Sequence, residues 1–231
     1  MSTWRASLAE GIATLLFVVI GAGSAVVSGM VPSDTPFPPA RIVAIAAAHG
    51  IGIALLVSAV GHISGGYINP AITFAAALTR RLASGRALAF AGAQLVGAVV
   101  GAYLLKLFIP AAILGGMGAT TLGEGVSTGG GLLAEAVFTF ALAFVVYATA
   151  IDPRGPKAIA PLAIGLTVLA DALVGVPLTG ASMNPARSLG PAVAGGVWTN
   201  HWVYWVGPLI GAALAGLVYE TFFMPREEGG G

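Results

Sequence analysis

Two short stretches of this chain carry asparagine, proline and alanine in the same order, at Asn69–Ala71 within GGYINPAIT and at Asn184–Ala186 within GASMNPARSLGP. Asn is a good helix N-cap and Pro is favoured at the first helical position, so each copy is typical of the start of a short helix. A helix N-terminus carries roughly half a positive charge and presents free N–H groups. Such a pair repels cations and binds polar oxygen atoms, and it needs no nucleophile to do so.

The chain around these motifs has the composition of an integral membrane protein. Of its 231 residues, 57% are hydrophobic and 8% are charged, whereas a soluble domain has roughly a quarter charged residues. A helix that begins inside a bilayer leaves backbone donors unsatisfied unless it borders a cavity or is enclosed by protein. Two such starts, one in each half of the chain, predict a pore or a binding site between them.

Other classes of function find little support in the composition. The net charge is +1, so nothing indicates a nucleic-acid or acidic partner. The chain has no cysteine, which removes disulfides, thiol chemistry and cysteine metal sites. We expect no metal site and no cofactor.

Six apolar stretches are long enough to cross a bilayer. Their approximate bounds are Ser7–Val31, Arg41–Val60, Gly85–Phe108, Gly129–Ala150, Ala158–Leu178 and His201–Met224. We interpret the first as a span rather than a signal peptide, because five more follow. The Gly- and Thr-rich segment Ile109–Thr128 is expected to be a long loop. Re-entrant loops followed by half-helices are expected at His62–Tyr67 with Asn69–Thr79, and at Thr179–Met183 with Asn184–Ala194.

The two halves of the chain repeat each other. Ala9-Glu10-Gly11 opens the first span as Ala134-Glu135-Ala136 opens the fourth, and an Asn-Pro-Ala copy follows each. Three crossings reverse the direction of the chain, so the second half must be inverted. The predicted fold is an all-α membrane protein with six transmembrane helices and two re-entrant half-helices. It is one channel domain over residues 1–231, with inverted repeats at about 7–108 and 129–224.

Basic residues indicate the orientation. With both termini in the cytoplasm, Arg41, Lys106 and Arg187 lie outside or in the pore, and the positive-inside rule is satisfied by the others. These are Arg5, Arg80, Arg81, Arg86, Arg154, Lys157 and Arg226. The pairs Gly97-x-x-x-Gly101 and Gly207-x-x-x-Gly211 permit close helix approach, although small residues are common in membrane helices generally.

The paired motifs resemble the aquaporin family over nearly the whole chain. The segments that carry the resemblance are GHISGGYINPA, AEAVFTFALAFVVYATAIDP, GASMNPARS and HWVYWVGP. The sequences of these segments are most similar to those of the plant tonoplast intrinsic proteins. The residues after the second motif are similar to those of the water-selective branch rather than the glycerol branch. The motif continues as Pro-Ala-Arg-Ser, with no aspartate after the arginine, and Tyr204 and Trp205 fit the same branch.

The resemblance implies a passive channel for water. The departure at Ala172, described below, adds ammonia and hydrogen peroxide as further candidates, with glycerol less favoured. The resemblance also implies exclusion of protons and ions, a homotetramer with one pore per protomer, and no enzymatic activity. The protein would lie in a lipid bilayer, the plasma membrane if the source is prokaryotic.

The residues expected at the pore midplane are the two tripeptides, whose half-helices would meet with their N-termini facing each other. Each Asn can cap its helix through the side-chain oxygen and direct its NH2 group at passing water. Arg187 lies one turn after Asn184, and a cation inside a bilayer is a functional hypothesis by default. The midplane set is Asn69, Pro70, Ala71, Asn184, Pro185 and Ala186.

The family's constriction implies three more positions, which fall on His49, Ala172 and Ala181 beside Arg187. Histidine at position 49 resembles the tonoplast group, whereas Ala172 departs from the histidine or isoleucine that the family usually has. We call His49, Ala172, Ala181 and Arg187 the filter. It should be wider than in a strictly water-selective member of the family. Arg187 supplies hydrogen-bond donors, and the sequence leaves open whether His49 does so too. A buried histidine with a purely structural role is the alternative for His49.

Three ionisable residues are expected to support the loops. Glu10 would accept hydrogen bonds from residues 62–68 and Glu135 from residues 179–183, and His62 would order the first loop. Asp171 could face the outer vestibule or another span, and the sequence does not decide. An ion-coupled transporter that uses Glu10, Glu135 or Asp171 as its carrier is the alternative function. An intramembrane enzyme is weaker, because no nucleophile and base have the spacing of a known motif.

Overall fold

The computed structural model describes residues 1–30, 33–34 and 36–225. Val31, the expected end of the first span, and Arg226, expected on the cytoplasmic side, lie outside the described residues. Within that part of the chain, helices account for nearly all regular structure.

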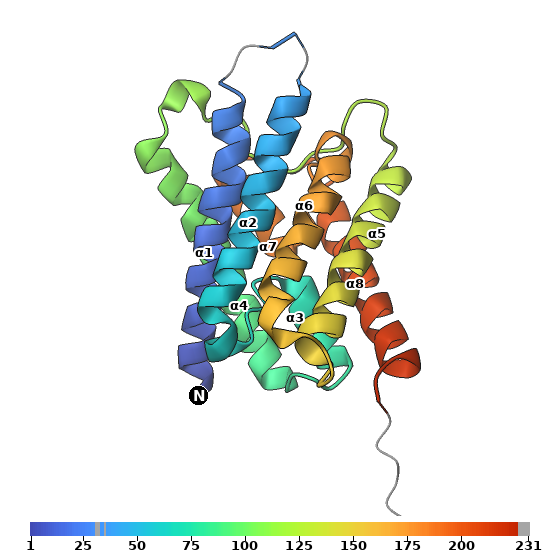
Figure 1. The fold of residues 1–231 in the computed structure, drawn as a ribbon. Coiled ribbons are helices and arrows are strands. Elements are labelled where there is room, and N and C mark those ends of the chain that lie inside the picture. The colour runs from blue at the N-terminus through green and yellow to red at the C-terminus, as the bar shows by residue number, and fades with distance from the viewer. Residues whose placement is uncertain (31–32, 35, 226–231) are drawn as a thin grey trace, which may run out of the picture.

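Six long helices enclose two short ones (Figure 1). The long helices are α1 (Thr3–Ser28), α2 (Pro39–Ser64), α4 (Ser84–Phe108), α5 (Thr128–Val146), α6 (Ala160–Thr179) and α8 (Val203–Phe222). With the short turns that extend α5 and precede α6, all six are long and apolar enough to cross a membrane, which confirms the six predicted spans. The short helices are α3 (Pro70–Leu78) and α7 (Pro185–Gly195).

The two half-helices enter the bundle from opposite ends. Figure 1 shows α3 in the lower part of the molecule and α7 above it, near mid-height between α2 and α6. Each begins at the proline of its motif, with the preceding Asn as N-cap. The starts of both helices therefore lie inside the bundle rather than at its surface.

Glycines set how closely the long helices pack in both halves. In the pair α1–α4, a methyl group on Gly97 would lie 2.1 Å from the carbonyl oxygen of Gly11. In the pair α5–α8, a methyl group on Gly211 would lie 2.1 Å from the carbonyl oxygen of Ala136. Neither position has room for a Cβ atom, so the small-residue pairs in the sequence do mark backbone contacts.

One boundary differs from the predicted one for an identifiable reason, whereas the fourth span ends within one residue of its predicted bound at Ala150. Helix α2 was expected to end near Val60, but it continues to Ser64 and ends where Gly65 takes the left-handed conformation, at φ 107°. Gly is the residue that adopts this conformation most easily, so it and not the apolar pattern fixes the end. Helix α5 continues into a π-helical turn, η2 (Tyr147–Ile151), before the polar turn that follows.

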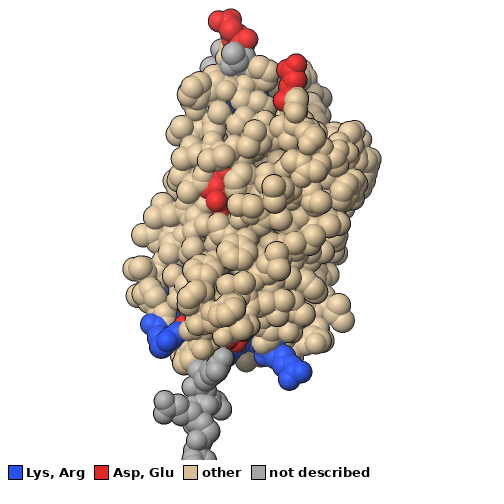
Figure 2. Space-filling model, turned by 90° about the vertical axis from the view of Figure 1, so that its right-hand side faces the viewer, with Lys and Arg blue, Asp and Glu red and all other residues tan. Residues whose placement is uncertain are grey.

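Charge is segregated along the long axis of the molecule. On the face in Figure 2, Lys and Arg atoms gather at the lower end, near the N-terminus, and Asp and Glu atoms appear at the upper end. The wall between is almost uncharged apart from a small acidic area at mid-height. This arrangement is the one that a bilayer-spanning bundle requires.

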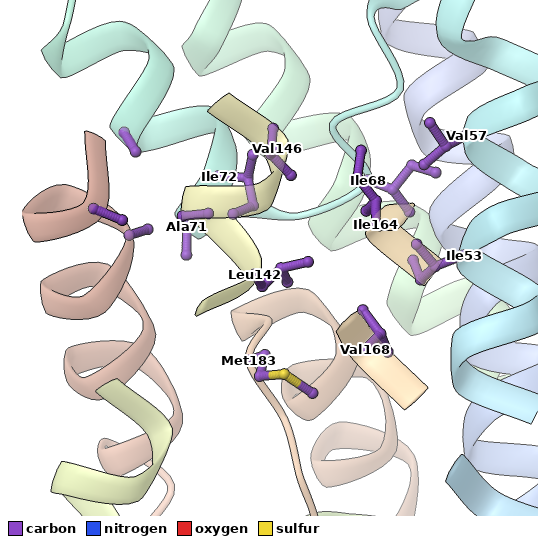
Figure 3. Packing of buried hydrophobic residues seen from close by; sticks show 14 of the residues in the cluster. Ile53, Val57, Ile68, Ala71, Ile72, Leu142, Val146, Ile164, Val168 and Met183 are labelled. Carbon is purple, nitrogen blue, oxygen red and sulfur yellow. The ribbon is translucent and has the colours of Figure 1, made fainter. Parts of the chain in front are cut away.

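The largest cluster of buried apolar side chains surrounds the half-helices. Figure 3 shows that its members come from α2, α3, α5 and α6 and turn toward a common space. Ile53 and Val57 of α2 lie opposite Leu142 and Val146 of α5. Much of this core is therefore also the wall of an internal passage.

Candidate transmembrane pore

The two asparagines cap the half-helices with closely similar geometry. Asn69 Oδ1 accepts a hydrogen bond from the Ala71 amide at 2.8 Å. Asn184 Oδ1 accepts one from the Ala186 amide at 3.0 Å and one from the Arg187 amide at 3.3 Å. Each side-chain oxygen thus satisfies backbone donors that the start of a helix leaves free.

The asparagine NH2 groups also join the two halves of the chain. Asn69 Nδ2 donates to the carbonyl of Met183 at 2.7 Å, and Asn184 Nδ2 donates to the carbonyl of Ile68 at 2.9 Å. Each Asn therefore binds the residue that precedes the other Asn. An amide nitrogen has two hydrogens, so each Asn keeps one for a molecule in the cavity that both residues line.

Glu10 lies fully buried in α1 and holds the first re-entrant loop. Its Oε1 accepts from the Ser64 hydroxyl at 2.5 Å and the Tyr67 amide at 3.0 Å. Its Oε2 accepts from the Ile68 amide at 2.6 Å and from Gln94 Nε2 at 2.8 Å. The carboxylate thus satisfies donors of a loop that has no regular secondary structure of its own.

Glu135 does the same in the second half, and its hydrogen-bond donors stand at the same offsets from Asn184 as those of Glu10 do from Asn69. Its Oε1 accepts from the Thr179 hydroxyl at 2.7 Å and the Ser182 amide at 2.9 Å, and its Oε2 accepts from the Met183 amide at 2.7 Å. Ser64 and Thr179 each stand five residues before an asparagine. The hydrogen bonds therefore repeat between the halves as the sequence does.

His62 does not have the position that the sequence analysis gave it. It lies in the last turn of α2, before the loop, and its side chain is exposed. The loop donors go to Glu10 and to the Ser64 hydroxyl, which also accepts from the Gly66 amide at 3.1 Å. The expectation that His62 orders this loop is corrected accordingly, and Ser64 is the residue that was missed.

An inner and an outer cavity lie on either side of a constriction. The inner cavity, of about 130 Å³, is lined by both asparagines, by His49 and Ala181, and by apolar side chains of α2, α5 and α6. The outer cavity, of about 970 Å³, is lined by Arg187, Arg41 and the loop that follows α4. The two cavities approach each other where His49 meets Arg187.

Arg187 is held in place on both sides of its guanidinium. Its Nε donates to His49 Nε2 at 3.2 Å, and its Nη1 donates to the carbonyl of Gly118 at 2.8 Å. The side chain is only 2% exposed although it borders the outer cavity. The remaining N–H groups find no acceptor among the described residues and can donate to a permeating oxygen atom.

His49 acts as an acceptor in the constriction, which settles its hydrogen-bonding role. Its Nδ1 lies 2.8 Å from the carbonyl of Ile45, which can only accept, so Nδ1 carries the proton. Its Nε2 accepts from Arg187. Both ring nitrogens are therefore occupied, and His49 offers no donor to a molecule in the pore.

The two alanines that the sequence analysis assigned to the filter are both buried, and Ala181 but not Ala172 is among the residues that line the two cavities. Ala181 lines the inner cavity and takes a left-handed backbone conformation, at φ 49°, that is uncommon for a non-glycine residue. Ala172 is 1% exposed and lies on α6 one turn from Val168, which lines the inner cavity, and one turn from Val176, which lines the outer one. Asp171 lines neither of these cavities and is half-buried, with Oδ2 unpaired.

The inner end of the passage is fixed by an ionic turn. Ala150 and Ile151 line the inner cavity, and Asp152 follows them directly. The carboxylate of Asp152 accepts from Arg154 Nη2 at 2.6 Å and from the Tyr219 hydroxyl at 3.1 Å, while Arg154 also donates to the carbonyl of Phe223. The Arg154 guanidinium holds the pKa of Asp152 well below its usual range, so the carboxylate stays ionised.

Glu135→Gln is expected to lower stability by roughly 1–3 kcal/mol, because the amide NH2 must face a backbone or hydroxyl donor of the loop. Thermal unfolding of the purified protein in detergent would measure the loss. Glu220→Gln is the control, since Glu220 pairs with Arg81 at the surface, where such pairs contribute about 0–1 kcal/mol. Equal stability of the two variants would show that Glu135 does not hold the loop.

These features define a class of protein: a membrane channel built from two inverted halves, with a narrow polar constriction. The chain matches the family model for major intrinsic protein over residues 1–219, and it belongs to that family. It is 49% identical to aquaporin TIP4-4 of Zea mays over 223 residues, covering 96% of this chain and 88% of the relative. It is 45% identical to aquaporin-4 of Mus musculus over 229 residues, covering 97% and 69%.

A solved structure agrees with the fold. The aquaglyceroporin from Plasmodium falciparum superimposes with a TM-score of 0.84 at 21% identity, covering 96% of this chain and 97% of that one. At that identity the likeness concerns the fold alone. Its agreement with the bundle in Figure 1 confirms the predicted architecture of six spans and two half-helices.

Proposed function

We propose that this protein is a passive membrane channel that conducts water and excludes protons and ions. The observation that carries the proposal is the constriction between the two cavities, where Arg187 is pinned by His49 and Gly118 above the paired asparagines. A water molecule crossing it meets N–H donors of Arg187 and then of Asn69 and Asn184. No step requires a reactive group.

Proton exclusion follows from the same residues. Two helix N-termini face the inner cavity, each with roughly half a positive charge, and Arg187 adds a full charge above them. A water molecule that accepts from both Asn amides has its oxygen occupied, so it cannot accept a proton from the next water in the file. Water therefore passes while the proton relay is interrupted.

The polar constriction also supports passage of small neutral solutes, ammonia and hydrogen peroxide before glycerol. Ala172 and Ala181 leave more room than larger residues would, and the donors of Arg187 favour polar molecules. The acceptor nitrogen of His49 is already bound by Arg187. A solute in the constriction therefore finds free donors only on Arg187, and the lining is less polar than if His49 also donated. Glycerol, which is larger and needs several partners, is accordingly the least favoured.

Ala172→Ile is expected to reduce peroxide and ammonia permeability several-fold more than water permeability, because three added carbon atoms narrow the filter. Fluxes of water, peroxide, ammonia and glycerol in proteoliposomes would give the ratios. Ala170→Ile is the matched control, since Ala170 lies exposed on the same helix. If the two variants kept the same ratios as the parent, Ala172 would not set the width of the pore.

The transporter alternative loses support from where its three candidate carriers lie. Both oxygens of Glu10 and of Glu135 accept hydrogen bonds from loop donors. Neither of these residues, nor Asp171, lines the inner or the outer cavity. A carboxylate that binds and releases a coupling ion needs access to the permeation path, which these residues lack.

The assembly and placement that we propose are a homotetramer in the plasma membrane, if the source is prokaryotic, with both termini in the cytoplasm. The gathering of basic atoms near the N-terminal end in Figure 2 supports this orientation. The corresponding pairs Glu10 with Ile68 and Glu135 with Met183 support one domain of two inverted repeats, at about 7–108 and 129–224. The tetramer rests on membership of the family.

Stopped-flow light scattering of proteoliposomes tests the function. The protein should raise the rate of osmotic shrinkage well above that of empty liposomes, and a protonophore should not alter that rate. A flux that depends on a pH gradient would favour the coupled transporter. A rate equal to that of empty liposomes would contradict the water-channel proposal.

A further inference from the structure

The loop between α4 and α5 forms hydrogen bonds with the second half-helix through two of its residues, Gly118 and Thr120. Gly118 accepts from Arg187 at 2.8 Å, and two residues later the Thr120 hydroxyl lies 2.7 Å from the Ser188 hydroxyl. Arg187 and Ser188 are neighbours in the first turns of α7. The outer loop is thus attached to the helix that carries the filter arginine and to that arginine itself.

Three buried hydroxyls continue this attachment into the re-entrant loop. Ser188 Oγ lies 2.6 Å from Ser182 Oγ, and Ser182 Oγ donates to the carbonyl of Asn184 at 2.9 Å. Thr120, Ser182 and Ser188 are 4%, 3% and 0% exposed. Bonds between such groups persist because water does not compete for them.

The direction of donation along this hydroxyl chain is fixed. A carbonyl only accepts, so Ser182 uses its one hydroxyl hydrogen on Asn184 and must accept from Ser188. Ser188 then has no hydrogen left for Thr120, so Thr120 donates to Ser188. The chain therefore runs from the outer loop to the cap of the half-helix, and every member depends on the one before it.

The backbone on either side of Thr120 leaves the loop little freedom. Gly118 has φ +68°, and a methyl group there would lie 2.5 Å from the carbonyl oxygen of Ala22. The Gly123 amide donates to the carbonyl of Leu178 at 2.8 Å. Between these two fixed points, the hydroxyl chain is what connects the loop to α7 beside the Gly118–Arg187 bond.

We propose that Thr120, Ser188 and Ser182 are positioning residues for the selectivity filter, acting through the Gly118 carbonyl on the guanidinium of Arg187. The chain holds Gly118 at the distance that keeps one N–H of Arg187 occupied and turns the others toward the pore. Without the chain, the segment is held only at Gly118 and Gly123, the Gly118 carbonyl can rotate away from the guanidinium, Arg187 gains rotational freedom, and the constriction discriminates less by size. This inference rests on the proposed channel function for its transport readout.

The first test compares two isosteric changes in proteoliposomes. Thr120→Val removes the outer hydroxyl, and we expect the ratio of glycerol to water permeability to rise roughly three- to tenfold, the effect of about one buried hydrogen bond. Thr73→Val is the control, because Thr73 stands four residues after Asn69 as Ser188 does after Asn184, but it bonds Gln94 instead of the outer loop. We expect Thr73→Val to retain the parent ratio.

Two further variants separate positioning from packing. Ser188→Ala should raise the ratio of glycerol to water permeability as Thr120→Val does. The double variant should raise it little more than the stronger single variant, because either change breaks the same chain. Thr120→Ser retains the hydroxyl and should restore the parent ratio. An equal rise in Thr73→Val, or a rise in Thr120→Ser as large as in Thr120→Val, would contradict the proposal.

A measurement without transport keeps this inference distinct from the channel proposal. Solid-state NMR of the protein in lipid, labelled with 15N-arginine and assigned with Arg187→Lys, should show a lower order parameter at Arg187 Nε in Thr120→Val than in the parent. An unchanged order parameter would overturn the positioning role even if the channel conducts water. A parent that conducts no water would contradict the channel proposal, and the order parameter would still decide this one.

Discussion

Arg187→Val is expected to raise the proton and sodium leak of proteoliposomes on the order of a hundredfold while water permeability stays within about twofold. A unit charge about 4 Å from a permeating cation opposes it by about 4 kcal/mol at an effective dielectric constant near 20, and the variant loses that barrier. Loss of that barrier alone corresponds to roughly a thousandfold, and the helix N-termini, which remain, limit the leak to the smaller factor. A trapped pH-sensitive dye would follow proton entry, and light scattering would follow water.

Arg187→Lys separates charge from shape in the same experiment. Lysine keeps the positive charge, so cations should stay excluded, but an ammonium cannot match the planar geometry that joins His49 and Gly118. We therefore expect altered solute ratios with little ion leak. If Arg187→Val conducted water normally and leaked no more than the parent, the barrier to ions would lie elsewhere.

Gly97→Ala should prevent recovery of folded protein. The added methyl group would lie 2.1 Å from the Gly11 carbonyl oxygen and 2.9 Å from its carbon, and the obstacle is backbone that no rotamer change can move. Helices α1 and α4 would have to separate along their length, and overpacking of this kind costs about 1–3 kcal/mol even where side chains can adjust. The yield of monodisperse protein after size-exclusion chromatography measures the effect.

Gly92→Ala, on the same helix, should have the opposite effect and raise the stability of the folded protein. Apart from its chain neighbours and the adjacent backbone of its own helix, no described atom lies within 4 Å of the position its Cβ would take. Alanine favours a helix over glycine by up to about 1 kcal/mol, so this variant should unfold at a slightly higher temperature. Equal yields for Gly92→Ala and Gly97→Ala would mean that α1 and α4 do not pack as described.

The sequence predicted most of the fold because the governing signals are local. Apolar length located the six spans, and the Asn-Pro pairs located the starts of α3 and α7. Glu10 and Glu135 could be assigned to their loops because a buried acceptor near unsatisfied donors has few other uses. The end of α2 was misplaced since apolar residues continue past it and only the backbone at Gly65 ends the helix.

Contacts between segments far apart in the sequence could not be predicted from these local signals. No local pattern shows that Gly118 would meet Arg187, because the donor is a side chain and the acceptor is a carbonyl that every residue possesses. His49 could be placed near the constriction, but its role as acceptor depends on Ile45 and Arg187 together. One signal was available: Ser64 and Thr179 occupy equal offsets in the repeat, and both are hydroxyls.

The crossed asparagine bonds have a consequence for how the protein is made. Asn69 donates to the Met183 carbonyl, 114 residues further along the chain, and the Ile68 carbonyl accepts from Asn184, 116 residues further along. At about 5–20 residues per second, the ribosome needs on the order of ten seconds to supply those partners. During that interval the first half-helix is in the translocon or the membrane, and the Asn69 NH2 group and the Ile68 carbonyl at its N-terminal end lack these partners. Insertion of α3 to its final depth should therefore be a late event, completed only after α7 has been synthesised, and a chain truncated before Met183 should leave residues 65–78 accessible to labelling from the aqueous side.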